Sequence, residues 1–172
     1  MNVKELIRDI IIVVVIVAAV TFFIKPIIVK QTSMLPTLQE NNYVFLNRQA
    51  YRFGQPKRGD IVVFPTDDGY GNEELYIKRV IGLPGETIDV ANGKVYVDGE
   101  VQDDSYTNDG TTPGDIHGFR VPEGELFVMG DNRVVSIDSR DPEVGTVPIE
   151  DITGVAFFRL FPFNEIGKVG GF

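Results

Sequence analysis

A serine and a lysine are the side chains of this sequence best suited to nucleophilic chemistry. Ser33 lies in the stretch Lys30–Leu38 (KQTSMLPTL), where a long apolar segment ends and Pro36 restricts the backbone. Cysteine is absent and the single histidine is His117, so the simplest partner for a serine nucleophile is a lysine. The same composition excludes disulfides, thiolate nucleophiles, thiolate zinc sites and multi-histidine metal sites. We therefore expect chemistry without a metal ion or a cofactor.

Lys78 stands apart from the other lysines because it lies inside an apolar run, Tyr76–Ile81 (YIKRVI). The alternation of a β-strand places its side chain on the same face as Tyr76 and the side chain of Arg79 on the opposite face. Burial against aliphatic neighbours lowers the pKa of a lysine from about 10.4, because the charged amine loses its hydration. A neutral Lys78 could then act as general base for Ser33. A snorkelling or salt-bridged lysine with a structural role is the alternative.

A polar turn, Gly130–Arg140 (GDNRVVSIDSR), follows another apolar run and contains the remaining candidate residues. Opposite charges could hold this turn against the Lys78 strand through ion pairs: Asp131 with Arg79, and Asp138 with Arg140. Ser136 could form a hydrogen bond that orients the amine of Lys78. Taken alone, the same sequence is also typical of a well-capped turn without a catalytic role.

The element that precedes Ser33 contains an uncharged run, Ile10–Ile24 (IIIVVVIVAAVTFFI). As a helix it spans about 22 Å at roughly 1.5 Å per residue, less than a bilayer core of about 30 Å. The flanking apolar residues complete the span if Arg8 and Lys25 snorkel, which predicts a transmembrane helix over about residues 6–29. We therefore expect an uncleaved membrane anchor in residues 1–30.

Other interpretations of this run fit the sequence less well. A removable signal peptide would need small residues where the bulky Phe22–Ile24 stand. A buried core helix would have a polar side dividing its faces, and this run has none. Charge does not decide the orientation of the anchor, because Lys4 and Arg8 on one side balance Lys25 and Lys30 on the other.

From about Gln31 onward the sequence changes to short β-branched runs separated by Gly, Pro, Asn and Asp, without the periodicity of a long helix. These runs predict strands at Tyr43–Leu46, Ile61–Phe64, Tyr76–Ile81, Thr87–Val90, Lys94–Val97, Glu125–Met129 and Gly154–Leu160. Ala91–Gly93 favours a hairpin turn. The predicted fold is a mainly β, antiparallel domain over residues 31–172.

Polar, glycine-rich segments interrupt this pattern at Asp67–Glu74 and Asp103–Gly118, and we expect both to be surface excursions. A calcium site at Asp103, Asp104 and Asp109 is an alternative, but their spacing does not match an EF-hand loop. The net charge of −9 argues against nucleic acid as a partner, and against an anionic lipid surface as the main partner of the domain. We expect a monomer.

Four segments together resemble the sequence boxes of type I bacterial signal peptidases, in the family's order and behind an N-terminal anchor. They are SMLPTL at Ser33–Leu38, RGDIVVF at Arg58–Phe64, YIKRVIGLPGE at Tyr76–Glu86 and GDNRVVSIDSR at Gly130–Arg140. The resemblance extends from the anchor to about Phe163. The short chain is similar to the Gram-positive form, which has one anchor and no large inserted domain.

This resemblance implies a role for each matching residue. Ser33 would be the acyl-forming nucleophile, Lys78 the general base and Ser136 the residue that orients the base. The pairs Asp131–Arg79 and Asp138–Arg140 would be structural. Met34 would line the site, and Tyr76 and Ile77 would lie along the groove that receives the signal peptide.

The family also implies partners and a location. Its members cleave exported pre-proteins after a small-x-small motif, so the signal peptide and the lipid bilayer are the expected partners. The chain would cross the cell membrane once, with its N-terminus in the cytoplasm and its β domain on the extracytoplasmic face.

The sequence departs from the family pattern at two places. Val135 stands where the family usually has Asn before its serine, and Val134 is also apolar. Gln31 stands where the family commonly has Ser or Gly. In members with serine at this position, its hydroxyl helps to hold the oxyanion together with the backbone N–H of the nucleophile. Here the backbone N–H of Ser33 is the first expected donor, and the Gln31 amide or a backbone group is the second.

These residues favour endoproteolysis by a membrane-anchored Ser-Lys dyad, and two other functions stay open. One is a self-cleaving Ser-Lys regulator of the repressor type, although neither a cleavage segment nor a DNA-binding module is recognisable. The other is a non-catalytic, membrane-anchored β domain that binds peptide or cell-wall material, which Gln31 and Val134–Val135 keep possible. His117 lies in an acidic, glycine-rich loop and is assigned no role.

Overall fold

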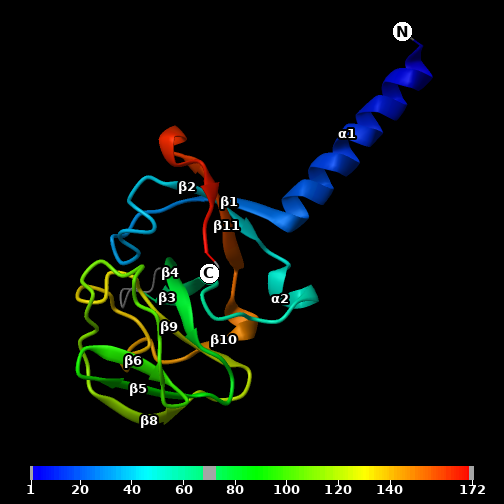
Figure 1. Cartoon of the computed structure of the whole chain (residues 1–172). Helices are drawn as coiled ribbons and strands as arrows, with labels where there is room; N and C mark the ends of the chain where they lie inside the picture. The colour runs from blue at the N-terminus through cyan, green and yellow to red at the C-terminus, as the bar shows by residue number, and fades with distance from the viewer. Residues whose placement is uncertain (1, 68–72, 171–172) are drawn as a thin grey trace.

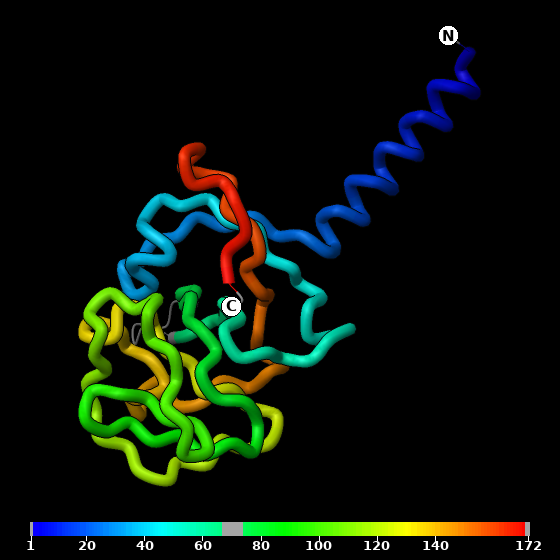
Figure 2. Tube along the Cα trace, viewed as in Figure 1, coloured from blue at the N-terminus to red at the C-terminus, as the bar shows by residue number. Residues whose placement is uncertain are grey.

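The computed structural model describes residues 2–67 and 73–170 (Figure 1). A long N-terminal helix projects away from a β-rich domain, which contains the C-terminal end of the described chain (Figure 2). Residues 68–72, the centre of the expected excursion Asp67–Glu74, lie outside the described residues.

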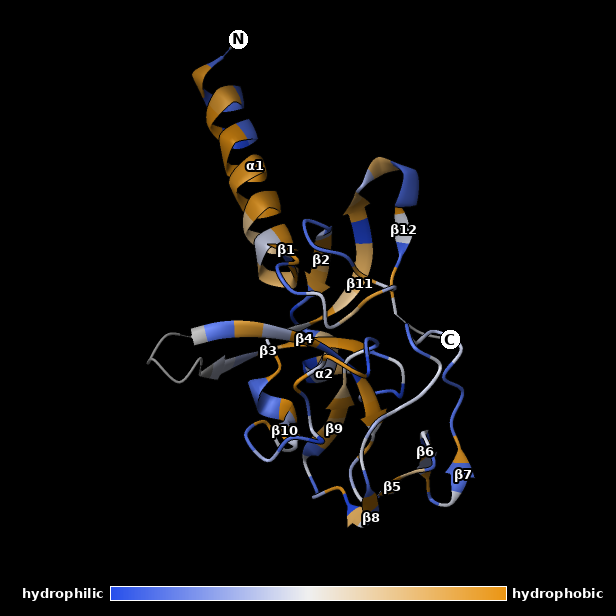
Figure 3. Cartoon of the chain, turned by 90° about the vertical axis from the view of Figure 1, so that its left-hand side faces the viewer, coloured by the Kyte–Doolittle hydropathy of each residue, from blue (hydrophilic) through white to orange (hydrophobic). Residues whose placement is uncertain are grey.

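Helix α1 (Val3–Phe23) begins with a capping box, in which Asn2 accepts a hydrogen bond from the backbone N–H of Lys4 and Glu5 binds the backbone of Asn2. None of its residues is buried, and its surface is apolar along most of its length (Figure 3). Its 21 residues extend roughly 31 Å at 1.5 Å per residue. Length and composition are therefore sufficient to cross a bilayer.

The prediction that this helix reaches about residue 29 is wrong. The helix ends at Phe23, and strand β1 (Ile24–Ile28) follows directly and pairs antiparallel with β2 (Tyr43–Asn47). Pro26 explains the change, because proline lacks the N–H that a helix needs and disfavours helical geometry at the preceding Lys25. An edge strand accepts proline without losing a sheet hydrogen bond.

The end of α1 is bound by the loop after β2. The backbone N–H of Arg48 donates to the carbonyl of Phe23 at 2.8 Å, and its Nη1 donates to the carbonyl of Thr21 at 3.3 Å. Gln49 Nε2 donates to the carbonyl of Phe22 at 3.2 Å. Carbonyls that a helix end leaves without partners are therefore satisfied by the domain itself.

The larger sheet is antiparallel and has the order β1-β2-β11-β3-β4-β9-β10, with β12 paired to β11. Its further strands are β3 (Ile61–Asp67), β4 (Glu73–Gly82), β9 (Glu125–Met129), β10 (Val147–Pro148), β11 (Gly154–Phe161) and β12 (Gly167–Lys168). Short helices connect them: α2 (Ala50–Phe53), η1 (Ile149–Asp151) and η2 (Phe163–Glu165). The mainly β, antiparallel fold predicted from the sequence is confirmed.

A smaller sheet has the order β7-β6-β5-β8. Its strands are β5 (Thr87–Ala91), β6 (Lys94–Val97), β7 (Glu100–Val101) and β8 (Ile116–Arg120). Strand β8 corrects the expectation that Asp103–Gly118 is wholly an excursion. It forms because Ile116 lies opposite Val90 of β5 and packs against the buried residues of this sheet.

Strand β4 packs apolar side chains on both of its faces. Ile77 belongs to a core cluster with Met34 and Leu38, whereas Val80 belongs to a second cluster with Val62. The central part of β4, from Ile77 to Ile81, is therefore buried on both sides. The base candidate Lys78 is thereby carried on one of the most enclosed strands of the domain.

Candidate active site

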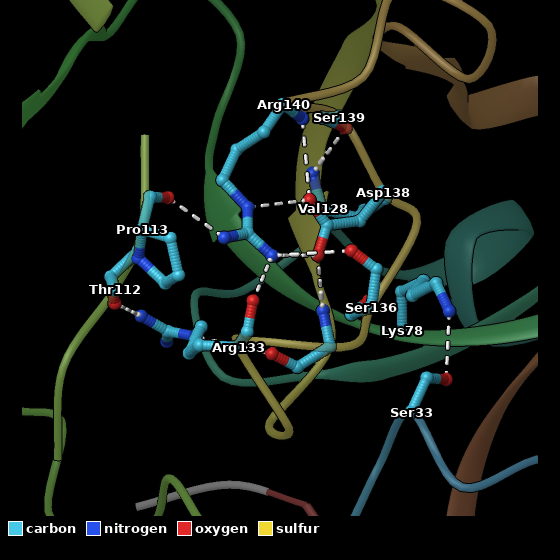
Figure 4. Close-up of polar contacts among 11 residues, drawn as sticks. Ser33, Lys78, Thr112, Pro113, Val128, Arg133, Ser136, Asp138, Ser139 and Arg140 are labelled. Atoms are coloured by element: carbon cyan, nitrogen blue, oxygen red, sulfur yellow. Dashed lines mark hydrogen bonds and ion pairs between the residues drawn. The ribbon is translucent and has the colours of Figure 1, made fainter. Parts of the chain in front are cut away.

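Ser33 and Lys78 meet in the structure although 45 residues separate them in the sequence (Figure 4). Nζ of Lys78 donates a hydrogen bond to Oγ of Ser33 at 2.7 Å. Lys78 is 2% exposed and Ser33 is 9% exposed. A nucleophile and a base within hydrogen-bond reach of each other are the geometry that covalent catalysis requires.

The surroundings of Lys78 favour its neutral form. Its neighbour on β3 is Val62, which is fully buried. The Tyr76 ring, with its centroid 4.8 Å from Nζ, acts in the opposite direction, because an aromatic face attracts an ammonium. Burial lowers the pKa of Lys78 to about 8, while the negative charge of Asp138 opposes this shift. A pKa near 8 leaves roughly a tenth of the amines neutral at pH 7, as a general base requires.

The turn that carries Ser33 is fixed from two directions. Below it, the side chains of Met34 and Leu38 are buried in the core. Above it, Asn132 donates from its backbone N–H to the carbonyl of Ser33 at 2.9 Å, and from Nδ2 to the carbonyl of Thr32 at 3.3 Å. The position of Ser33 therefore depends on the Gly130–Arg140 turn.

Both expected ion pairs are present beside the dyad. Arg79 binds Asp131 through Nε–Oδ1 at 2.7 Å and Nη2–Oδ2 at 2.6 Å, with both side chains buried. Asp138 accepts from Nε and Nη2 of Arg140, each at 2.8 Å, and from the backbone N–H of Gly130 at 3.0 Å. Charge-assisted, bidentate bonds of this kind give the turn a single geometry.

Ser136 does not form the expected hydrogen bond to Lys78. Its Oγ is buried and has no hydrogen-bond partner among the described residues, because the amine of Lys78 is directed to Ser33 instead. Ser136 nevertheless lies close to the turn that carries Ser33. A Cβ on Gly130 would be 2.3 Å from Ser136 Oγ and 2.4 Å from the carbonyl oxygen of Ser33, so only glycine fits between them.

A cleft of about 250 Å³ ends at Ser33. Its walls come from β1 with the segment after it, from the turn that carries Ser33 and from the start of β4. The lining residues are Ile27, Ile28, Val29, Lys30, Gln31, Ser33, Met34, Glu74, Leu75 and Ile77. The predicted lining positions of Met34 and Ile77 agree with this cleft. Tyr76 does not line it, because its side chain points to the other face of β4, where its ring lies 6.2 Å from that of Phe64.

The cleft runs between two strands that have unpaired edges there. Among the described residues of the larger sheet, β1 pairs with β2 alone, and β4 pairs with β9 only from Arg79 onward. The backbone between Glu74 and Lys78 therefore has a free edge toward the cleft. An extended peptide could add to these edges as a further strand.

Sequence reasoning missed a set of contacts around Arg133. This side chain is buried and donates to the carbonyl of Gly130 at 3.1 Å, to Thr112 Oγ1 at 2.6 Å and to the Tyr106 hydroxyl at 3.0 Å. It ties the Asp103–Gly118 segment to the active-site turn. No spacing in the sequence pointed to this link, because its partners lie in a polar segment that is far away along the chain.

The acidic residues of that segment have other partners. Asp104 pairs with Lys94 Nζ at 2.7 Å, and Asp103 accepts from the backbone N–H of Ser105 at 2.9 Å. Within residues 2–67 and 73–170, no group of three or more potential ligands gathers to hold a metal ion. His117 is exposed and lies 2.9 Å from Asp115.

Comparison with known proteins assigns this arrangement to a family. The model of the family described as signal peptidase, peptidase S26, matches residues 3–161. The chain belongs to this family. Its type I assignment, expected from the sequence, is confirmed by the relatives it matches, and the chain is accordingly a serine endopeptidase of the signal peptidase I type.

These relatives are similar to the chain over most of its length. A Synechocystis protein named "Probable signal peptidase I-1" is 38% identical over 176 residues, covering 99% of this chain and 88% of the relative. Signal peptidase I of Bacillus licheniformis is 37% identical over 156 residues, covering 86% of this chain and 82% of the relative. A crystal structure of a signal peptidase I from Enterococcus faecalis V583 gives a TM-score of 0.50 at 32% identity, covering 59% of this chain and 96% of that one.

Proposed function

We propose that this signal peptidase cleaves by a Ser-Lys dyad, with Ser33 as nucleophile and Lys78 as general base. The observation that carries the proposal is the 2.7 Å contact between Ser33 Oγ and a buried Lys78 Nζ. With the amine neutral, the Ser33 proton passes to Nζ while Oγ attacks the scissile carbonyl carbon. The Lys78 ammonium then protonates the leaving amine and an acyl ester on Ser33 remains.

Deacylation uses the same pair of residues. A water molecule gives one proton to the neutral Lys78 and attacks the ester carbonyl, and collapse of the intermediate returns the proton to Ser33 Oγ. The developing oxyanion accepts a hydrogen bond from the backbone N–H of Ser33. The second donor is the side-chain amide of Gln31, which lines the cleft. Losing one such donor typically costs about 3–4 kcal/mol in the transition state. Ser136 orients Lys78 once the amine has turned away from the acylated Ser33.

The acyl side of the substrate adds as a strand between β1 and β4. Its small side chains, three positions and one position before the scissile bond, occupy the shallow cleft beside Met34 and Ile77. The lining residues Met34 and Ile77 are apolar, which suits small aliphatic side chains such as that of alanine.

Helix α1 anchors the enzyme in the cell membrane with a single pass, its N-terminus cytoplasmic and its peptidase domain extracytoplasmic. Exposed apolar residues also gather at the end of the domain from which α1 leaves. The β11–β12 hairpin projects from this end in both views (Figures 1 and 3) and carries Phe161, Phe163 and Ile166 on its surface. Anchoring confines enzyme and tethered substrate to one surface, which raises their effective concentration.

The decisive experiment uses the full chain in detergent with a synthetic peptide that contains an Ala-x-Ala site. Wild type should cleave the peptide after the second alanine, and Ser33→Ala should lose essentially all activity. Equal behaviour of the two proteins would overturn the proposal and favour a peptide-binding domain. Cleavage restricted to the enzyme's own chain would favour a self-cleaving regulator.

A further inference from the structure

Apolar side chains interrupt the polar turn beside the dyad at Val134, Val135 and Ile137. They are 57%, 57% and 50% exposed. None of them belongs to a buried core cluster of the domain. Their neighbours in the same turn, Asp131 and Asp138, are in contrast buried and paired. The fold therefore gains little from these three side chains, which leaves their apolar character unexplained by stability.

The backbone that carries them is linked by hydrogen bonds to the backbone of Ser33. Val135 donates from its N–H to the carbonyl of Asn132, whose own N–H donates to the carbonyl of Ser33 at 2.9 Å. Ser136 Oγ and the Ser33 carbonyl oxygen both lie within 2.4 Å of the point that a Cβ on Gly130 would occupy. Val135 and Ile137 flank Ser136 in sequence. Figure 4 shows the ribbon looping out between Arg133 and Ser136 to form this surface.

This apolar surface lies outside the acyl-side cleft. Among the described residues, the cleft is lined by residues 27–31, 33, 34, 74, 75 and 77, and by none of Gly130–Arg140. A peptide that fills the cleft up to Ser33 must continue past the dyad on another side. The turn that binds the Ser33 carbonyl adjoins the dyad and contributes no residue to the cleft.

We propose that Val134, Val135 and Ile137 form the docking surface for the first residues after the scissile bond, and that they favour apolar side chains at those positions. The inference rests on the proposed proteolysis and adds a specificity that the small-x-small rule does not contain. Covering a valine side chain with an apolar partner contributes enough to change a rate about five- to tenfold.

The charges around the turn favour a peptide over lipid as the occupant. The backbone N–H of Asn108 donates to the carbonyl of Asp131 at 3.1 Å, which brings the acidic Asp103–Gly118 segment against the turn. Asp109 and Asp115 of that segment are exposed. Inserting the turn into a bilayer would carry these carboxylates toward hydrocarbon at a high cost, whereas a peptide strand covers the valines and leaves the carboxylates hydrated.

The first test compares two peptides with the same Ala-x-Ala acyl side, one followed by Val-Leu and the other by Ser-Asn. Wild type should cleave the apolar peptide with a kcat/KM about five- to tenfold higher. The variant Val134→Asn/Val135→Asn should reduce this ratio to within twofold, because it loses the preference for the apolar peptide. Val101→Asn is the matched control, because Val101 is a 59% exposed valine on β7 and should keep the full ratio.

A second test does not require turnover. In Ser33→Ala, a peptide with a photoreactive diazirine-leucine directly after the scissile bond should label residues 134–137, and the same probe at the x position of the small-x-small motif should label β1 or β4 beside the cleft. Equal cleavage of both peptides by wild type, or absence of label in the turn, overturns this inference while the Ser-Lys proposal stands. Labelling of the turn by photoreactive lipid in vesicles without peptide would assign the surface to the bilayer. Equal peptide cleavage by wild type and Ser33→Ala would instead overturn the proposed proteolysis, on which this inference rests.

Discussion

The guanidinium of Arg79 and the carboxylate of Asp131 face each other as parallel forks in the protein interior, with contacts of 2.6 and 2.7 Å. Arg79 follows Lys78 on β4, and Asp131 opens the Gly130–Arg140 turn that holds Ser33. The pair therefore joins the strand of the proposed base to the turn that positions the nucleophile. It acts on the dyad through geometry, without touching substrate.

Removing one member of this pair should be costly. Asp131→Asn or Arg79→Met leaves a buried charge without its partner, which typically destabilises a protein by about 3–5 kcal/mol. The double replacement Arg79→Met/Asp131→Leu should recover part of this loss, since both charges are then absent. Urea unfolding of each variant in detergent measures the effect, and a loss below about 1 kcal/mol in the single variants would contradict a pair that fixes the fold.

The rate of cleavage should depend on the protonation of Lys78. Burial lowers the pKa of this amine to about 8, and only the neutral form accepts the Ser33 proton. We therefore expect kcat/KM to rise tenfold per pH unit up to about pH 8 and to level off above it. A peptide substrate without titratable side chains measures this profile. An ascending limb that continues to pH 10 would show that the base is an unperturbed lysine.

Lys78→Met should separate catalysis from stability. A lysine whose folded pKa lies near 8 and whose unfolded value is 10.5 disfavours the folded state below pH 8, and this penalty fades as the pH rises toward 10.5. The methionine variant should be inactive and, at pH 7, more stable by up to about 3 kcal/mol. The gain should shrink when unfolding is measured near pH 10. Destabilisation at neutral pH would identify Lys78 as a structural residue.

The β11–β12 hairpin should contact lipid next to α1. The protein contains no tryptophan, so Phe163→Trp introduces a single fluorescent reporter at a side chain that is 72% exposed. In vesicles this tryptophan should shift to shorter wavelength and be quenched by brominated lipid. Phe119→Trp, on β8 of the smaller sheet, is the control and should remain unquenched. Equal quenching of both reporters would contradict a specific contact between the hairpin and the lipid.

Local sequence was sufficient where one element determines the outcome. Lys78 is carried on a strand whose alternation puts it beside Tyr76 and opposite Arg79, and the charge pairs of the Gly130–Arg140 turn form as their spacing suggests. Hydropathy alone misjudged the residues after Phe23. Three of the five residues of β1 are isoleucines, but Pro26 and the available edge of β2 select a strand.

Contacts between distant segments were beyond sequence reasoning. The side of β4 that faces the cleft depends on how the sheet curves, so Ile77 lines it and Tyr76 does not. The pairing of Arg133 with Thr112 and Tyr106 depends on where a polar segment folds back. Lys78 Nζ bonds Ser33 and not Ser136, and this choice depends on how two distant turns pack beside β4, which residue types do not encode.

The direct junction of α1 and β1 has a mechanical consequence. The helix ends at Phe23 and the sheet begins at Ile24. Arg48 and Gln49 bind the helix terminus, so no flexible linker separates α1 from the peptidase domain. With α1 in the membrane, as we propose, such a joint would fix the height of Ser33 and Lys78 above the bilayer. The peptide bond that reaches this height would then be the one that is cleaved.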